Sequence, residues 1–121
     1  MINWDRKRQH LVVPLEQTET QCEILFENPS MSENIALICH PHPLHQGTMY
    51  NKVTAAIAKG FNEAQIATFR FNFPGVGQST GQFDDGRGEA QITQALLDLI
   101  KKEFRPQNTF LSGFSFGGAI A

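Results

Sequence analysis

Five consecutive residues near the end of the chain have the types and spacing that nucleophilic chemistry requires. They read Gly113-Phe114-Ser115-Phe116-Gly117 and match the pattern G-x-S-x-G. A serine in this pattern sits on a sharp turn between a strand and a helix, where its hydroxyl stands clear of the backbone. The flanking glycines have no Cβ atoms to collide where strand and helix pass close together. The pattern therefore indicates Ser115 as a nucleophile and the following Phe116 N–H as an oxyanion donor.

The sequence on either side of this motif supports the interpretation. The apolar segment 109–112 precedes it and has the length of a strand, and the small residues 118–121 follow it as the opening of a helix. The alternative is a glycine-rich turn that carries an incidental serine. Because the motif stands between a predicted strand and a predicted helix, we favour the nucleophile.

A second group of reactive residues follows the apolar run at residues 35–39. Residues 40–48 read H-P-H-P-L-H-Q-G-T. In folds that use a serine turn of this kind, a loop after an earlier strand supplies a second oxyanion amide. The two prolines have no N–H, so the donor would be His42, Leu44 or His45. We favour Leu44, which lies just past the rigid proline segment.

The three histidines of this loop allow other roles. His40, His42 and His45 lie within six residues and could supply zinc ligands. They alternate with prolines, and we predict neither a metal nor a cofactor. The histidines could also do no more than shape the loop, or His42 or His45 could act as a base for Ser115. We assign His42 and His45 to the binding residues of the site.

The rest of the chain supplies the elements that must position these residues. Apolar runs predict strands, and apolar residues at three- and four-residue spacing predict helices. The predicted strands are 10–14, 22–26, 35–39, 66–71 and 109–112, and the predicted helices are 53–64, 89–103 and the segment from Ser115 onward. This order implies an α/β fold with a mainly parallel sheet, helices on both faces and an antiparallel N-terminal edge.

A glycine-rich segment, residues 74–88, follows the fourth predicted strand. Ligands bind at the carboxyl ends of strands in open α/β sheets, so the segment lies where a site is expected. It lacks the G-K-[S/T] ending of a phosphate-binding loop. We expect Asp84 and Asp85 in the same segment to be solvated or to cap a turn.

Composition limits the class of protein. The 121 residues suffice for one domain, 40% of them are apolar, and 18% are charged with a net charge of −2. Scattered charge of this kind argues against nucleic acid or an anionic membrane as a partner. The two cysteines, Cys22 and Cys39, stand in apolar runs and are expected to be reduced core residues, which predicts a cytoplasmic location.

Three motifs in order resemble the small bacterial α/β-hydrolases related to the dienelactone-hydrolase and carboxylesterase group. The patterns of that family are H-P-H-P-L-x-G-G-T-M-x-N-K, F-N-F-R-G-V-G-x-S-x-G-x-F-D and G-F-S-F-G. Their counterparts here are residues 40–52, 71–84 and 113–117. Gln46 replaces the first glycine of the first loop, and Pro74 replaces the usual arginine of the second.

The resemblance implies the α/β-hydrolase fold, with Ser115 as nucleophile and the Phe116 and Leu44 amides as oxyanion donors. In this fold the catalytic triad follows the chain order Ser, Asp or Glu, His. The six residues after Ser115 include no acid and no histidine. We therefore expect residues 1–121 to be the N-terminal part of a single domain, truncated after the elbow, with the triad Asp and His beyond Ala121.

The expected function is hydrolysis of a small carboxylic ester or related acyl compound through an acyl-enzyme, in the complete protein. No metal or organic cofactor is expected. The alternative is a catalytically inactive fragment that acts as a pseudo-enzyme or an interaction module. Such a fragment could form a homodimer that covers the exposed edge of its sheet.

Overall fold

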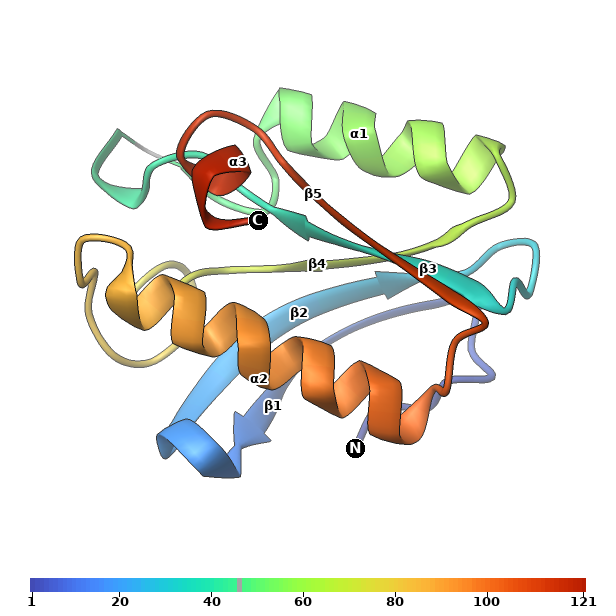
Figure 1. Ribbon diagram of the computed structural model, residues 1–121, viewed down its shortest axis with the longest axis horizontal. Helices are drawn as coiled ribbons and strands as arrows, with labels where there is room; N and C mark the ends of the chain where they lie inside the picture. Colours follow the sequence, from blue (N-terminus) through green and yellow to red (C-terminus); the bar gives the residue numbers. More distant parts are fainter. Residues whose placement is uncertain (46) are drawn as a thin grey trace.

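Five strands form one mixed sheet in the order β1-β2-β4-β3-β5 (Figure 1). The computed structural model describes residues 1–45 and 47–121, and of residue 45 only the backbone. The strands are β1 (Arg8–Leu15), β2 (Thr20–Glu27), β3 (Asn34–Cys39), β4 (Ala67–Phe71) and β5 (Asn108–Gly113).

The direction of the strands divides the sheet into two halves. β3 runs parallel to both β4 and β5, whereas β1 pairs with β2, and β2 with β4, in antiparallel fashion. The predicted parallel region and the antiparallel N-terminal edge are confirmed. The antiparallel region reaches one pair further than predicted, because β2 inserts beside β4.

Helices cover both faces of the sheet, as predicted. The helices are α1 (Lys52–Glu63), α2 (Arg87–Glu103) and the short α3 (Phe116–Ile120), with single 3-10 turns η1 (Glu16–Thr18) and η2 (Pro43–His45). α1 lies on one face and α2 on the other (Figure 1). No helix in residues 1–45 or 47–121 is long and apolar enough to cross a membrane.

The alternation of side chains along β3 explains its continuous apolar run. Ile35 and Leu37 belong to the larger core, which includes Leu96 and Ile100 of α2. Ala36 and Ile38 point to the opposite face and belong to the smaller core, with Ala58 of α1. Successive side chains of a strand face opposite sides of the sheet, so a strand covered on both sides must be apolar throughout.

The parallel half of the sheet brings the three sequence motifs to one edge. The strands β3, β4 and β5 run in the same direction, with Ile38 opposite Arg70 and Cys39 opposite Gly113. Three segments follow the carboxyl ends of these strands: the histidine-proline loop (residues 40–49) after β3, the glycine-rich loop (residues 74–88) after β4, and the serine motif after β5. The edge at which ligands bind in open α/β sheets therefore carries all three motifs.

Candidate functional site

Ser115 occupies a strained turn between β5 and α3. Its φ is 58° and its ψ is −119°, and its side chain is exposed. A positive φ costs free energy at any residue with a Cβ atom and persists only where the surrounding structure imposes it. The predicted arrangement of strand, sharp turn and helix around Ser115 is confirmed.

The two glycines of the motif are required by close backbone contacts. A Cβ atom at Gly113 would lie closer than 3.0 Å to the backbone of Gly117. A Cβ atom at Gly117 would lie equally close to the carbonyl oxygens of Cys39 and His40. The turn is therefore pressed onto the carboxyl end of β3, where any larger residue at position 117 would collide with main chain.

Phe116 as an oxyanion donor stays a prediction, and its place in the backbone is compatible with that role. Phe116 is the first residue of α3, so its N–H has no acceptor within the helix. The following turn closes by a hydrogen bond from the Gly117 N–H to the Phe114 carbonyl at 3.0 Å. The backbone geometry thus leaves the Phe116 N–H outside the hydrogen bonds of the turn and the helix.

The structure brings His42 to the elbow but engages the Leu44 amide locally. The His42 ring centroid lies 4.8 Å from that of Phe116 and 4.7 Å from that of Phe83. The Leu44 N–H donates to Nδ1 of His42 at 3.1 Å. Leu44 as an oxyanion donor stays a prediction, and that hydrogen bond would have to open for the amide to meet an oxyanion.

The same hydrogen bond argues against His42 as a base for Ser115. Because Nδ1 of His42 accepts the hydrogen bond from the Leu44 N–H, a neutral ring must carry its own proton on Nε2. In that tautomer the ring has no lone pair left to take the proton of Ser115. The side chain of His45 and the whole of Gln46 lie outside the described residues.

His40 is a structural residue, not a reactive one. It is fully buried; its Nε2 accepts the Phe73 N–H at 3.0 Å, and its Nδ1 lies 2.7 Å from the Pro41 carbonyl. Nδ1 must therefore carry the proton and donate it to that carbonyl. Burial lowers the pKa of His40 to about 4, although the hydrogen bond to Pro41 acts in the opposite direction.

The occupied nitrogens of His40 argue against the zinc alternative. Both of its ring nitrogens are engaged with main chain, so neither can bind a metal without breaking a hydrogen bond. Within the part of the chain that the structure describes, no three His, Cys, Asp or Glu side chains are grouped as a metal site would need. Asp84 and Asp85 are exposed beside the start of α2, as predicted.

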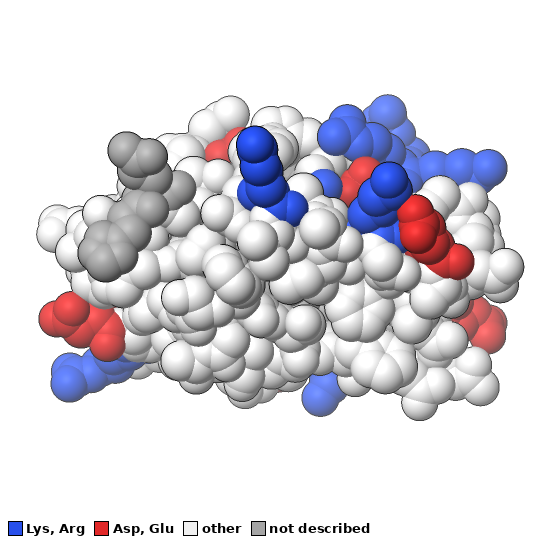
Figure 2. Space-filling model, turned by 90° about the horizontal axis from the view of Figure 1, so that it is seen from above, with Lys and Arg blue, Asp and Glu red and all other residues white. Residues whose placement is uncertain are grey.

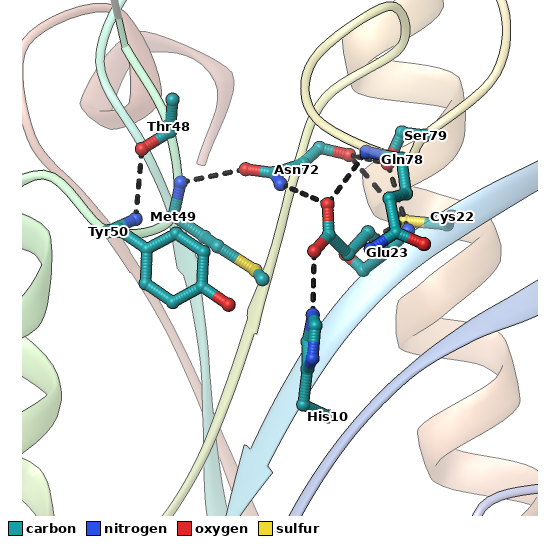
Figure 3. Close-up of polar contacts among 9 residues, drawn as sticks. All are labelled: His10, Cys22, Glu23, Thr48, Met49, Tyr50, Asn72, Gln78 and Ser79. Atoms are coloured by element: carbon teal, nitrogen blue, oxygen red, sulfur yellow. Dashed lines mark hydrogen bonds and ion pairs between the residues drawn. The ribbon is translucent and has the colours of Figure 1, made fainter.

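A polar cluster centred on the buried side chain of Glu23 was missed by the sequence analysis. Its members are Glu23, His10, Asn72, Gln78 and Ser79, called here the Glu23 cluster (Figure 3). Glu23 stands in β2 and is only 5% exposed. The available signal was an acidic residue inside the apolar run 22–26, but its partners are distant in sequence.

Solved structures that are similar to this chain include α/β serine hydrolase homologues. A solved structure of such a homologue from Coxiella burnetii is 36% identical to this chain and has a TM-score of 0.88. The match covers 98% of this chain and 57% of the Coxiella chain. A lidless α/β serine hydrolase from Xanthomonas campestris is 29% identical and has a TM-score of 0.87. That match covers 94% of this chain and 53% of the Xanthomonas chain. An uncharacterised protein from Rickettsia prowazekii is 43% identical over 88 residues, 72% of this chain and 37% of that protein. No family model matches.

The chain has the α/β-hydrolase fold. The predicted fold class is thereby confirmed. The nucleophile of this fold stands on a sharp turn between a strand and a helix, and Ser115 occupies a turn of that kind. The chain spans little more than half the length of the two similar structures.

The crowding at Gly117 leads to a prediction about stability. The change Gly117→Ala should lower the free energy of unfolding by about 1–3 kcal/mol or more, because its methyl group meets the main chain of β3. Gly118→Ala is the matched control, since a Cβ atom there makes only an ordinary contact of 3.4 Å with the Gly113 carbonyl oxygen. Urea unfolding should separate the two variants, and equal midpoints would contradict the contact described for the turn.

The buried neutral His40 leads to a prediction about pH. The unfolded chain takes up a proton near the ordinary histidine pKa of 6.5, whereas folded His40 does so only near 4. Stability should therefore fall as the pH drops between these values, by about 2 kcal/mol from pH 7 to pH 5. Urea unfolding at the two pH values should show this loss in the wild type and less of it in His40→Asn. An equal loss in both proteins would show that another group is responsible.

Proposed function

We propose that the full-length protein is a serine hydrolase that cleaves small carboxylic esters or related acyl compounds through an acyl-enzyme. The observation that carries this proposal is the Ser115 backbone, held at a φ of 58° between a strand and a helix. A fold does not by itself imply a function, but a strained, exposed serine at this point is the feature that nucleophilic catalysis needs. The similarity to α/β serine hydrolase homologues also supports the proposal of a serine hydrolase.

In the proposed reaction, Ser115 Oγ attacks the carbonyl carbon of the ester as its proton passes to a base. The tetrahedral oxyanion collapses, the alcohol leaves with a proton, and an acyl-enzyme remains. Water then attacks the acyl group and releases the carboxylic acid and free Ser115. The reaction requires neither a metal nor an organic cofactor.

The base and its orienting acid are proposed to lie beyond Ala121. The chain order of the triad in this fold is Ser, then Asp or Glu, then His. Residues 116–121 include none of these side chains, and the neutral tautomer of His42 makes it a poor substitute. Residues 1–121 would then be the N-terminal part of one catalytic domain, related to the dienelactone-hydrolase and carboxylesterase group.

The oxyanion is proposed to bind the Phe116 N–H and one amide of the histidine-proline loop. Removing a single preorganised donor of this kind costs about 100- to 1000-fold in rate. His42 or Leu44 would supply the loop amide, and for Leu44 the hydrogen bond to the His42 ring would have to open.

We also propose a cytoplasmic location for the protein. Cys22 and Cys39 are free and buried. Burial raises the pKa of each thiol to about 12, which keeps both protonated and unreactive. Reduced core cysteines of this kind are typical of a reducing compartment.

The nucleophile is tested by replacing Ser115 in the full-length protein. Ser115→Ala should lower the turnover of para-nitrophenyl acetate by at least about 1000-fold, because the acyl-enzyme can no longer form. It should also abolish labelling by a fluorophosphonate. Ser112→Ala is the matched control, three residues earlier in β5, and should retain turnover within about twofold. Turnover that survives in Ser115→Ala would refute the proposed function.

A second candidate function is favoured by the surface of β5. This strand stands last in the sheet order, and Phe110 and Leu111 on it are each 42% exposed. Seen from the α1 side, charged side chains gather over one part of the surface and leave a broad part without them (Figure 2). A strand edge with exposed apolar side chains is a template for pairing with another chain. The 121-residue chain alone would then be an interaction module that pairs with a second copy along β5.

Self-association gives the second candidate its test. The 121-residue chain should have twice its monomer mass in light scattering, and Leu111→Lys should return it to a monomer because a charge cannot be buried in that contact. Leu44→Lys places the same charge on an equally apolar but 69% exposed side chain outside β5, and should leave the dimer intact. A monomer at all concentrations would reject this candidate.

A further inference from the structure

A buried carboxylate on β2 holds three hydrogen-bond donors from different parts of the chain. Glu23 Oε1 accepts the side-chain amide of Asn72 at 2.8 Å and the backbone N–H of Gln78 at 2.7 Å. Glu23 Oε2 lies 2.6 Å from Nε2 of His10 on β1. Figure 3 shows these groups converging on the carboxylate. Glu23 thus joins β1, β2 and the glycine-rich loop that follows β4.

The charge state of Glu23 follows from these contacts. Burial alone would raise the pKa of its carboxyl, but the hydrogen bonds from Gln78, His10 and Asn72 outweigh burial and hold the pKa below its ordinary value. The group is therefore a carboxylate at neutral pH. A buried carboxylate is costly unless it is fully hydrogen-bonded, so its donors are held firmly in place.

Asn72 passes this constraint on to the histidine-proline loop. Its Nδ2 donates to Glu23, and its Oδ1 accepts the Met49 N–H at 2.8 Å. The carboxylate can only accept hydrogen bonds and therefore decides which way round the amide stands. If the amide turned over, its NH2 group would face the Met49 N–H, donor against donor, and the link to the loop would be lost.

The histidine-proline loop is consequently clamped at both ends to consecutive residues after β4. At its start, His40 accepts the Phe73 N–H at 3.0 Å, and at its end Met49 donates to Asn72 at 2.8 Å. Between the two clamps lie His42 and Leu44, which carry the candidate oxyanion amides. The position of those amides relative to Ser115 thus depends on the two clamps.

Gly77 is an independent sign that the Glu23–Asn72 pair is tightly enclosed. A Cβ atom at Gly77 would lie closer than 3.0 Å to both Glu23 Oε1 and Asn72 Nδ2. Ser79 closes the cluster from the same loop, since its hydroxyl accepts the Glu23 N–H at 2.9 Å and donates to the Asn72 carbonyl at 2.7 Å. The glycine-rich loop therefore covers Glu23 and Asn72 and holds the two side chains at hydrogen-bond distance.

We propose that Glu23 is a positioning residue for the esterase reaction: by orienting Asn72, it sets where the oxyanion-donating amide of the histidine-proline loop lies. The inference rests on the proposed function and deepens it. The described contacts of Glu23 include neither Ser115 nor the amides of His42 and Leu44, so its effect is transmitted through the loop. An amide displaced by about 1 Å stabilises the transition state less while leaving ground-state binding almost unchanged.

The test compares two buried glutamates in the full-length protein. Glu23→Leu replaces the carboxylate with an apolar side chain of similar size, so that Asn72 and Gln78 both lose their acceptor. It should lower kcat for para-nitrophenyl acetate about 10- to 100-fold while KM stays within about threefold. Glu89→Leu is the matched control. Glu89 is also buried, and its carboxylate accepts the N–H groups of Gly86 and Asp84 at the start of α2, on its own segment of the chain. This control should keep kcat within about twofold.

The outcomes separate the positioning role from general loss of structure. Urea unfolding is measured on both variants, and Asn72→Ala, which removes the link itself, should reproduce the kcat effect of Glu23→Leu. A kcat within twofold of wild type in Glu23→Leu, or an equal loss of kcat in Glu89→Leu, would overturn the positioning role alone. Full turnover in Ser115→Ala would overturn the proposed function, and with it this inference.

Discussion

The structure depends on one contact, the close approach of Gly117 to the carbonyl oxygens of Cys39 and His40. No side chain fits there, so the turn after β5 can press directly onto the end of β3. That approach imposes the positive φ of Ser115 and keeps Gly113 in register with Cys39. The strain of the serine is thus offset by packing and by the pairing of β3 with β5.

Two buried titratable side chains near this edge of the sheet have opposite charge states. His40 is neutral in the fold, because desolvation disfavours its charged form and its two nitrogens match one donor and one acceptor of the main chain. Glu23 is ionised, because its hydrogen bonds outweigh the same desolvation. Both side chains hold loops in place through hydrogen bonds. In the proposed enzyme they have a structural role, whereas Ser115 reacts with the substrate.

The edge strand β5 is less well covered than its inner neighbour β3. The side chains of β3 from Ile35 to Cys39 are fully buried, whereas Phe110 and Leu111 on β5 are 42% exposed. α3 and the Phe61 ring of α1, 6.0 Å from Phe110, cover β5 only in part. The elbow therefore stands on the least covered strand of the sheet. Anything that packs on β5, whether further chain or a second copy, would also bear on the position of Ser115.

The sequence by itself determined the features that depend on neighbouring residues. Apolar runs and helical spacing predicted the strands and helices to within a few residues, and G-x-S-x-G predicted the turn at Ser115, because both signals are local. Tertiary structure decided the features that join distant segments. These are the antiparallel pairing of β2 with β4, the neutral state of His40, and the hydrogen bond between Glu23 and Asn72, which are 49 residues apart. A polar residue in an apolar run can indicate that partners exist. Only the folded chain shows which groups come within hydrogen-bond distance, since that depends on the order and direction of the strands.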